Sequence, residues 1–173
     1  VGATGSVGGE ICRRLAASGQ PVRALVRESS APDKVSALQA MGVETVVGDL
    51  RDRASLDAAC RGISAVITTV SSMPFSYVPG QNDIASTDMA GAMRLVDAAV
   101  AAGAGHFTYT SFSNNLDVDT PLFRAKRAVE QHVIESGLGY TILRPSCFME
   151  AWLSPMVGFD PANARATIYG TGT

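Results

Sequence analysis

The chain has 173 residues, a formal net charge of −2 and a hydrophobic fraction of 46%. This length suits one domain with a sizeable core, and the charge offers no basic surface for nucleic acid. The most apolar run, ISAVITTV at residues 63–70, is too short to cross a membrane. Three scattered cysteines, Cys12, Cys60 and Cys147, show no paired spacing. We therefore expect no disulfide framework, no metal site and no membrane or nucleic-acid partner, and favour a cytoplasmic protein.

The sequence opens on a glycine-rich turn, GATGSVGG, at residues 2–9. Ile11 and Leu15 follow it at helical spacing, and Gly19 ends the predicted helix. Such a turn usually follows a strand, but only Val1 precedes the first glycine. We therefore expect the first strand to be cut short.

Short β-branched runs then alternate with helical patterns. The predicted strands are residues 21–26, 43–47, 64–70, 106–110 and a strand within 139–145. The predicted helices are residues 33–41, a short helix within 53–62, 86–102 and 121–136. This alternation predicts an α/β fold in which a doubly wound parallel sheet carries helices on both faces.

Two of these elements carry a finer prediction. The run at residues 64–70 is nearly continuous in apolar and β-branched residues, as in a strand buried on both faces. The helix over 86–102 places an apolar stripe on one side, formed by Met89, Met93, Val96 and Val100.

The opening turn has the composition of a phosphate-binding loop. In a parallel sheet, the first strand–helix turn presents backbone N–H groups and the positive end of the helix dipole to an anion. Gly2 would permit the tight turn, Gly5 the approach of a diphosphate, and Gly8 close packing of the helix. The spacing GxxGxxG is one residue wider than the usual dinucleotide fingerprint, and a glycine turn without a ligand is the alternative.

Positions after the next strands extend this hypothesis. Arg27 follows the second strand, where an arginine accommodates the 2′-phosphate of NADP, whereas Glu28 beside it keeps NAD as the alternative. A solvated surface arginine is the structural alternative. Asp49 would accept from the adenine amino group and Leu50 would cover the ring, unless Asp49 merely caps the next helix.

Lys126 lies on an apolar stripe of the helix over 121–136, in line with Leu122, Val129 and Val133. A lysine on a core-facing stripe is rare unless its ammonium meets a partner. We interpret its amine as reaching the cleft to bind ribose hydroxyls, with Lys126 as a proton donor if its pKa is lowered. The alternative is a solvated amine paired with Glu130 one turn later.

The segments GATGSVGG, VRALVR, VVGDL, AAVAAGAGHFTYTS and SGLGYTILRP together resemble the NmrA-like group of atypical short-chain dehydrogenases/reductases. The resemblance extends to about Pro145. It implies an NAD(P)-binding Rossmann domain over residues 1–145, with its first strand truncated. Residues 146–173 would then begin a small substrate-binding lobe that is incomplete.

The resemblance also implies a set of site residues. The dinucleotide would contact Gly2, Thr4, Gly5, Ser6, Val7, Gly8, Arg27, Asp49, Leu50, Thr69, Val70, Lys126, Pro145, Ser146 and Phe148. Lys126 and Ser111 would be the catalytic residues, although a serine that ends a strand commonly only caps the loop. Classical members carry a tyrosine four residues before the lysine, and Leu122 stands there instead. The tyrosine route to ketone reduction and sugar epimerisation therefore loses support.

We accordingly expect an NAD(P)H-dependent oxidoreductase that passes a hydride to a small planar acceptor such as a quinone, or to a carbonyl. Water or Lys126 would supply the proton. The alternative is a non-catalytic NADP(H)-binding redox sensor with a protein partner, and a weaker one is a nucleotide-sugar epimerase or dehydratase. An apolar cluster would either wall an aromatic substrate or join the second lobe to the sheet: Phe148, Met149 and Trp152.

Overall fold

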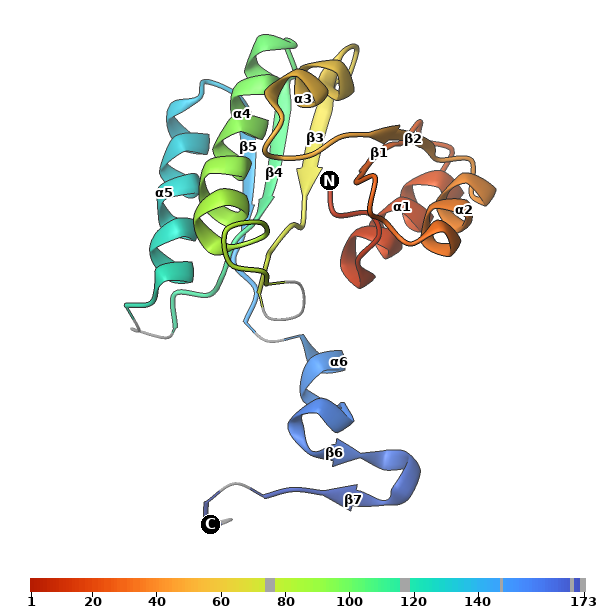
Figure 1. Cartoon of the computed structure of the whole chain (residues 1–173), viewed down its shortest axis with the longest axis vertical. Helices are drawn as coiled ribbons and strands as arrows, with labels where there is room; N and C mark the ends of the chain where they lie inside the picture. Colours follow the sequence, from red (N-terminus) through yellow and green to blue (C-terminus); the bar gives the residue numbers. More distant parts are fainter. Residues whose placement is uncertain (74–76, 116–118, 147, 169, 172–173) are drawn as a thin grey trace.

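The computed structural model describes residues 1–73, 77–115, 119–146, 148–168 and 170–171. Strands and helices alternate along most of the chain (Figure 1). In order they are α1 (Ser6–Ala17), β1 (Arg23–Val26), α2 (Pro32–Ala40), β2 (Glu44–Val47), α3 (Arg53–Cys60), β3 (Ala65–Thr68), η1 (Ile84–Gly91), α4 (Ala92–Ala101), β4 (His106–Thr110), α5 (Pro121–Glu135) and β5 (Gly139–Leu143). The expected alternation is confirmed, with boundaries that differ by a few residues from the predicted ones.

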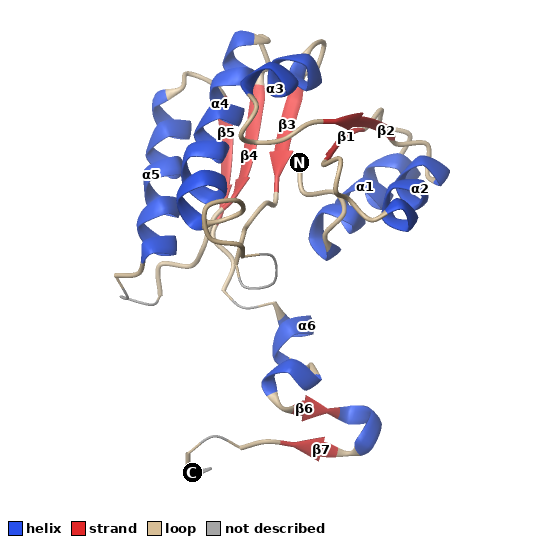
Figure 2. Cartoon of the chain, in the orientation of Figure 1, coloured by secondary structure: helices blue, strands red, loops and turns tan. Residues whose placement is uncertain are grey.

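The strands form parallel ladders, as predicted. β1 pairs with β2, and β3, β4 and β5 pair in that order. Helices α3, α4 and α5 cover one face, and α1 and α2 lie beside β1 and β2 (Figure 2). In β1, Leu25 packs into the core shared with α3, α4 and α5, whereas Ala24 and Val26 pack against α1 and α2. Because successive side chains of a strand point to opposite faces, β1 has a helical layer on each side.

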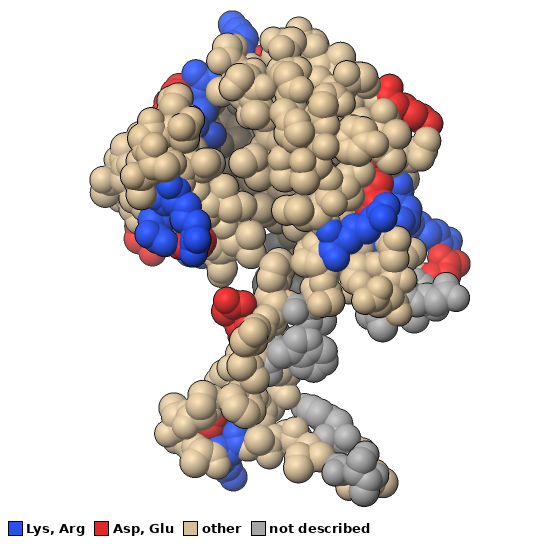
Figure 3. All heavy atoms as spheres, turned by 180° about the vertical axis from the view of Figure 1, so that it is seen from behind, with Lys and Arg blue, Asp and Glu red and all other residues tan. Residues whose placement is uncertain are grey.

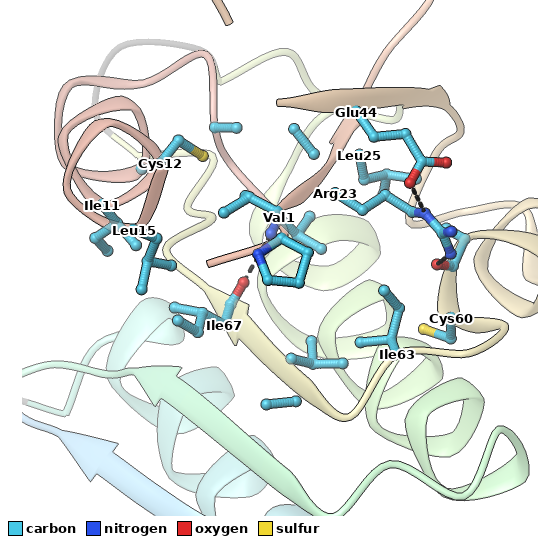
Figure 4. A pocket seen from close by; sticks show the side chains of 18 of the residues that line it. Val1, Ile11, Cys12, Leu15, Arg23, Leu25, Glu44, Cys60, Ile63 and Ile67 are labelled. Carbon is cyan, nitrogen blue, oxygen red and sulfur yellow. Dashed lines mark hydrogen bonds and ion pairs between the residues drawn. The ribbon is translucent and has the colours of Figure 1, made fainter. Parts of the chain in front are cut away.

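A cavity of about 410 Å³ lies between β1 and β3, with α1 and α3 contributing to its walls (Figure 4). Val1 lies in this cavity and pairs with the β3 segment. Its amino group donates to the Ile67 carbonyl at 2.7 Å, and its own carbonyl accepts from the Thr69 N–H at 3.2 Å. The prediction that residues 64–70 are buried on both faces is wrong for one face of β3, because Ala65 is exposed and Ile67 only partly buried where they line this cavity.

The edges of β1 and β3 that face the cavity are suited to one more parallel strand. We expect a short β-branched segment fused ahead of Val1 to raise the melting temperature by several degrees, since about 1 kcal/mol corresponds to roughly 2–4 °C in a domain of this size. The test compares the melting temperature of this fusion with that of a glycine–serine fusion of equal length, both measured by thermal unfolding. Equal melting temperatures would show that the cavity does not accept a strand.

The helix predicted over 86–102 is built differently. Its first part, η1, is a π-helix, which Asp83 caps by accepting from the Ser86 N–H at 2.8 Å; α4 follows directly. The wider turn changes which side chains face inward. The predicted apolar stripe is right for Val96, which is fully buried, and for Met93, which packs against the core. It is wrong for Met89 and Val100, which are 37% and 43% exposed. The buried face of α4 consists of Ala92, Leu95, Val96, Ala98 and Ala99.

The segment after β5 extends away from the sheet and its helices (Figure 1). It contains α6 (Met149–Trp152), η2 (Pro155–Val157), β6 (Phe159–Asp160), η3 (Pro161–Asn163) and β7 (Arg165–Ala166), and β6 pairs with β7 antiparallel. Seen from behind, it carries few charged side chains (Figure 3). No helix within the described ranges has both the length and the apolar character that a membrane span requires.

Candidate functional site

A pocket of about 420 Å³ opens where β1, β2 and β3 end. Its walls come from the glycine turn and from the residues that follow each of these strands. Many of the predicted site residues line it, namely Gly2, Thr4, Gly5, Ser6, Arg27, Asp49, Leu50, Thr69 and Val70. The parallel topology explains this convergence, because the carboxyl ends of parallel strands share one edge of the sheet.

The glycine turn brings backbone close to backbone. Gly2 has a φ of +87°, and a Cβ there would lie 2.7 Å from the Thr69 Oγ1 atom. A Cβ on Gly8 would lie 2.2 Å from the Gly2 carbonyl oxygen. Gly5 is the N-cap of α1, and no side chain caps this helix. The first N–H groups of α1 thus have the arrangement that binds an anion at a helix N-terminus.

A turn after β1 presents cationic side chains to the pocket. The Arg27 N–H donates to the Ser30 hydroxyl at 3.0 Å, and the Ser30 N–H donates to the Arg27 carbonyl at 2.9 Å. Arg27, Ser30 and Lys34 all line the pocket, and Arg27 is exposed. Sequence reasoning missed Lys34. Its place in the first turn of α2, shortly after Arg27, is the signal that would have found it.

Asp49 lines the pocket but is already bound by Arg51. The Arg51 Nη2 and Nε atoms donate to the two Asp49 carboxylate oxygens at 2.8 Å each, and this contact lowers the pKa of Asp49. Arg51 also reaches the Gln81 carbonyl at 3.0 Å. The alternative that Asp49 caps the next helix is wrong, because Asp52 caps α3 by accepting from the Ala54 N–H at 3.0 Å.

Lys126 is buried behind the pocket wall and does not line the pocket. Its Nζ atom donates to the Val70 carbonyl at 3.1 Å, lies 3.3 Å from the Asp88 Oδ1 atom and sits 5.3 Å from the centre of the Tyr109 ring. Burial lowers the pKa of Lys126, and Asp88 partly offsets this effect. The alternative of a solvated amine paired with Glu130 is therefore wrong. Asp88 was missed, although an acidic residue within the apolar pattern of η1 is a signal.

Ser111 belongs to a second cluster, at the ends of β4 and β5, in which Ser111 and Glu130 are buried and the Arg144 side chain is 43% exposed. The Ser111 hydroxyl donates to Glu130, which also accepts from Arg127 and, at 2.6 Å, from Arg144. Burial alone would raise the pKa of Glu130, but hydrogen bonds from Arg144, Ser111 and Arg127 outweigh it and lower the pKa. Sequence reasoning named Ser111, and named Glu130 only as an alternative partner of Lys126; it did not name Arg144.

The remaining predicted residues lie outside the pocket lining. Val7 and Phe148 are 37% and 45% exposed, Ser146 is exposed, and the Pro145 carbonyl accepts from the Ser113 N–H at 2.9 Å. Gly8 instead lines the cavity between β1 and β3. Cys147 and the side chain of Trp152 lie outside the described residues. The structure therefore brings the residues expected at the adenosine half of a dinucleotide together in one pocket. The residues expected at the nicotinamide half do not line this pocket.

The parallel ladders and the glycine turn define a doubly wound α/β protein with an anion-binding first turn. The chain belongs to the NmrA-like family, whose model matches residues 1–169, and the resemblance seen in the sequence is confirmed. It is 36% identical over 171 residues to the (4-alkanoyl-5-oxo-2,5-dihydrofuran-3-yl)methyl phosphate reductase of Streptomyces griseus, covering 98% of this chain and 54% of that protein. The chain thus spans about half the length of this relative.

Two solved structures are similar in fold. The triphenylmethane reductase of Citrobacter sp. complexed with NADP(H) gives a TM-score of 0.72 at 26% identity, over 90% of this chain and 51% of that chain. The NADPH-dependent quinone oxidoreductase QOR2 of Escherichia coli complexed with NADPH gives a TM-score of 0.69 at 26% identity, over 91% of this chain and 52% of that chain.

Proposed function

We propose that this chain is the cofactor-binding part of an NAD(P)H-dependent reductase that prefers NADP(H) and passes a hydride to a small, planar acceptor such as a quinone. The observation that carries the proposal is the pocket where the uncapped N-terminus of α1 faces the same space as Arg27. The similarity to reductases solved with NADP(H) supports it. Residues 1–145 would form the cofactor domain, and residues 146–173 would begin the substrate lobe.

Each part of the pocket has a chemical role in this proposal. The backbone N–H groups at the start of α1 would bind the diphosphate, and Arg27 with Lys34 would bind the 2′-phosphate. The segment 69–71 would run along the middle of the dinucleotide. When bound, the nicotinamide supplies the hydride, whereas the protein supplies orientation and charge. Because Lys126 lies behind Val70, we propose that it supports this wall and that water delivers the proton.

Replacing Arg27 by alanine is expected to weaken NADPH binding by about tenfold to a hundredfold, the value of a charge-assisted hydrogen bond of about 1.5–3 kcal/mol. NADH lacks the 2′-phosphate, so its affinity is expected to change by less than about twofold. Calorimetric titration of both cofactors makes the test. Arg14→Ala is the matched control, because Arg14 is exposed on α1 and pairs with Glu10. Equal losses for NADPH and NADH would refute the 2′-phosphate assignment.

A non-catalytic NADP(H)-binding sensor is the second candidate function, and Leu122 at the position of the classical tyrosine favours it. The two functions differ in turnover. A reductase oxidises NADPH in the presence of a quinone panel, whereas a sensor binds NADPH without consuming it. Stopped-flow absorbance of NADPH, recorded together with its binding isotherm, separates these outcomes.

A further inference from the structure

Glu130 connects three segments at the carboxyl edge of β4 and β5. Its carboxylate is 4% exposed and accepts from Ser111 after β4, from Arg127 on α5 and from Arg144 after β5. The Arg144 contact is bidentate, with Nη2 at 2.6 Å from Oε2 and Nε at 3.1 Å from Oε1. A buried carboxylate with this many charge-assisted partners holds its neighbours in one geometry.

The same cluster continues the pairing of β4 with β5 past the ends of both strands. The Ser111 N–H donates to the Leu143 carbonyl at 2.7 Å, and the Ser113 N–H donates to the Pro145 carbonyl at 2.9 Å. Arg127 donates to the Phe112 carbonyl between these two bonds. Glu130 and its arginines therefore hold segments 111–113 and 143–145 together from the side of α5.

These segments lie beside the proposed cofactor pocket but are not part of it. The pocket is built by the ends of β1, β2 and β3. β4 and β5 follow β3 in the same parallel ladder, so their carboxyl ends continue the same edge. A dinucleotide whose adenosine half fills the pocket extends its other half along this edge.

We propose that Glu130 is a positioning residue for the nicotinamide half of the cofactor: it fixes segments 111–113 and 143–145, so that the two halves of the dinucleotide are held by separate parts of the protein. This inference rests on the proposed function. It predicts that loss of the Glu130 cluster weakens ligands that contain the nicotinamide half and spares ligands that contain only the adenosine half.

The test compares NADPH with adenosine 2′,5′-bisphosphate, which carries only the adenosine half. Glu130→Gln removes the negative charge of the carboxylate. Arg144→Met removes the link to β5 and leaves Glu130 its contacts with Ser111 and Arg127. The Arg144→Met variant therefore decides the outcome if the Glu130→Gln variant does not fold. The matched control is Arg124→Met, because Arg124 lies on the same helix and pairs with the exposed Asp119.

We expect both variants to bind NADPH at least about tenfold more weakly, the equivalent of one lost hydrogen bond to a charged group, and the bisphosphate within about twofold of the wild-type protein. Amide exchange at Ser111 and Ser113 should be faster in both variants and unchanged in the control. Unchanged NADPH affinity, or equal losses for the two ligands, would overturn the proposal. A wild-type chain that binds neither ligand would refute the proposed function itself.

Discussion

Replacing Gly8 by alanine is expected to abolish the fit between α1 and the glycine turn. The added Cβ would lie 2.2 Å from the Gly2 oxygen, 2.7 Å from the Gly2 carbonyl carbon and 3.0 Å from the Ala3 Cα atom. All three are backbone atoms, so no side chain can rotate to make room. The helix must move away from the turn, and the first N–H groups of α1 move with it.

This displacement should affect stability and binding together. We expect destabilisation at the upper end of the roughly 1–3 kcal/mol that overpacking costs, and a loss of NADPH affinity of at least about tenfold. Urea unfolding and calorimetric titration measure the two effects. Gly105→Ala is the control, because its Cβ would make only an ordinary contact of 3.6 Å with the Ser64 carbonyl. A Gly8→Ala protein that unfolds and binds like the wild type would show that close packing at Gly8 is not required.

The elements of the fold and half of the candidate site could be read from the sequence because their signals are local. A glycine turn before an amphipathic helix predicts an anion-binding N-terminus, and Arg27 and Asp49 follow strands whose ends must meet. The phase of the helix over 86–102 could not be read in this way. The π-helical geometry of η1 leaves no mark on hydrophobic spacing, so the exposure of Met89 could not be read from the sequence. Val100 lies near the end of α4 and is exposed although Val96, one turn earlier, is buried.

Side-chain partners were harder to predict than elements, because they depend on contacts between distant segments. The position of Lys126 on an apolar stripe revealed that its amine needs a partner, but not that the partner is Asp88. Ser111 was named for a family role, yet its contact with Glu130 depends on how α5 lies across β4. Asp49 was assigned to adenine without regard to Arg51, which binds its carboxylate.

The buried pair of Lys126 and Asp88 should have the other large effect on stability. The Asp88 Oδ2 atom accepts from the backbone N–H of Ser72 at 2.9 Å and from the Ser72 hydroxyl at 2.5 Å, while the Asp88 Oδ1 atom faces the Lys126 amine. Asp88→Asn keeps the size of the side chain but leaves a buried ammonium without its counter-charge. We expect a loss of about 3–5 kcal/mol at pH 7, measured by urea unfolding. Asp57→Asn is the control, because its ion pair with Arg53 is exposed and should contribute less than about 1 kcal/mol.

The pH dependence of this loss gives a sharper test than its size. Burial lowers the pKa of Lys126 and Asp88 raises it, so Asp88→Asn should lower the pKa further. Between the folded and the unfolded pKa of a lysine, the unfolded chain binds the extra proton, and stability rises with pH. In the variant this rise starts at a lower pH than in the wild-type protein, so the difference in unfolding free energy should narrow between pH 7 and pH 9.5. A difference that stays constant over this range would mean that Lys126 is not the group left without a counter-charge, and that the loss comes from the contacts with Ser72 instead.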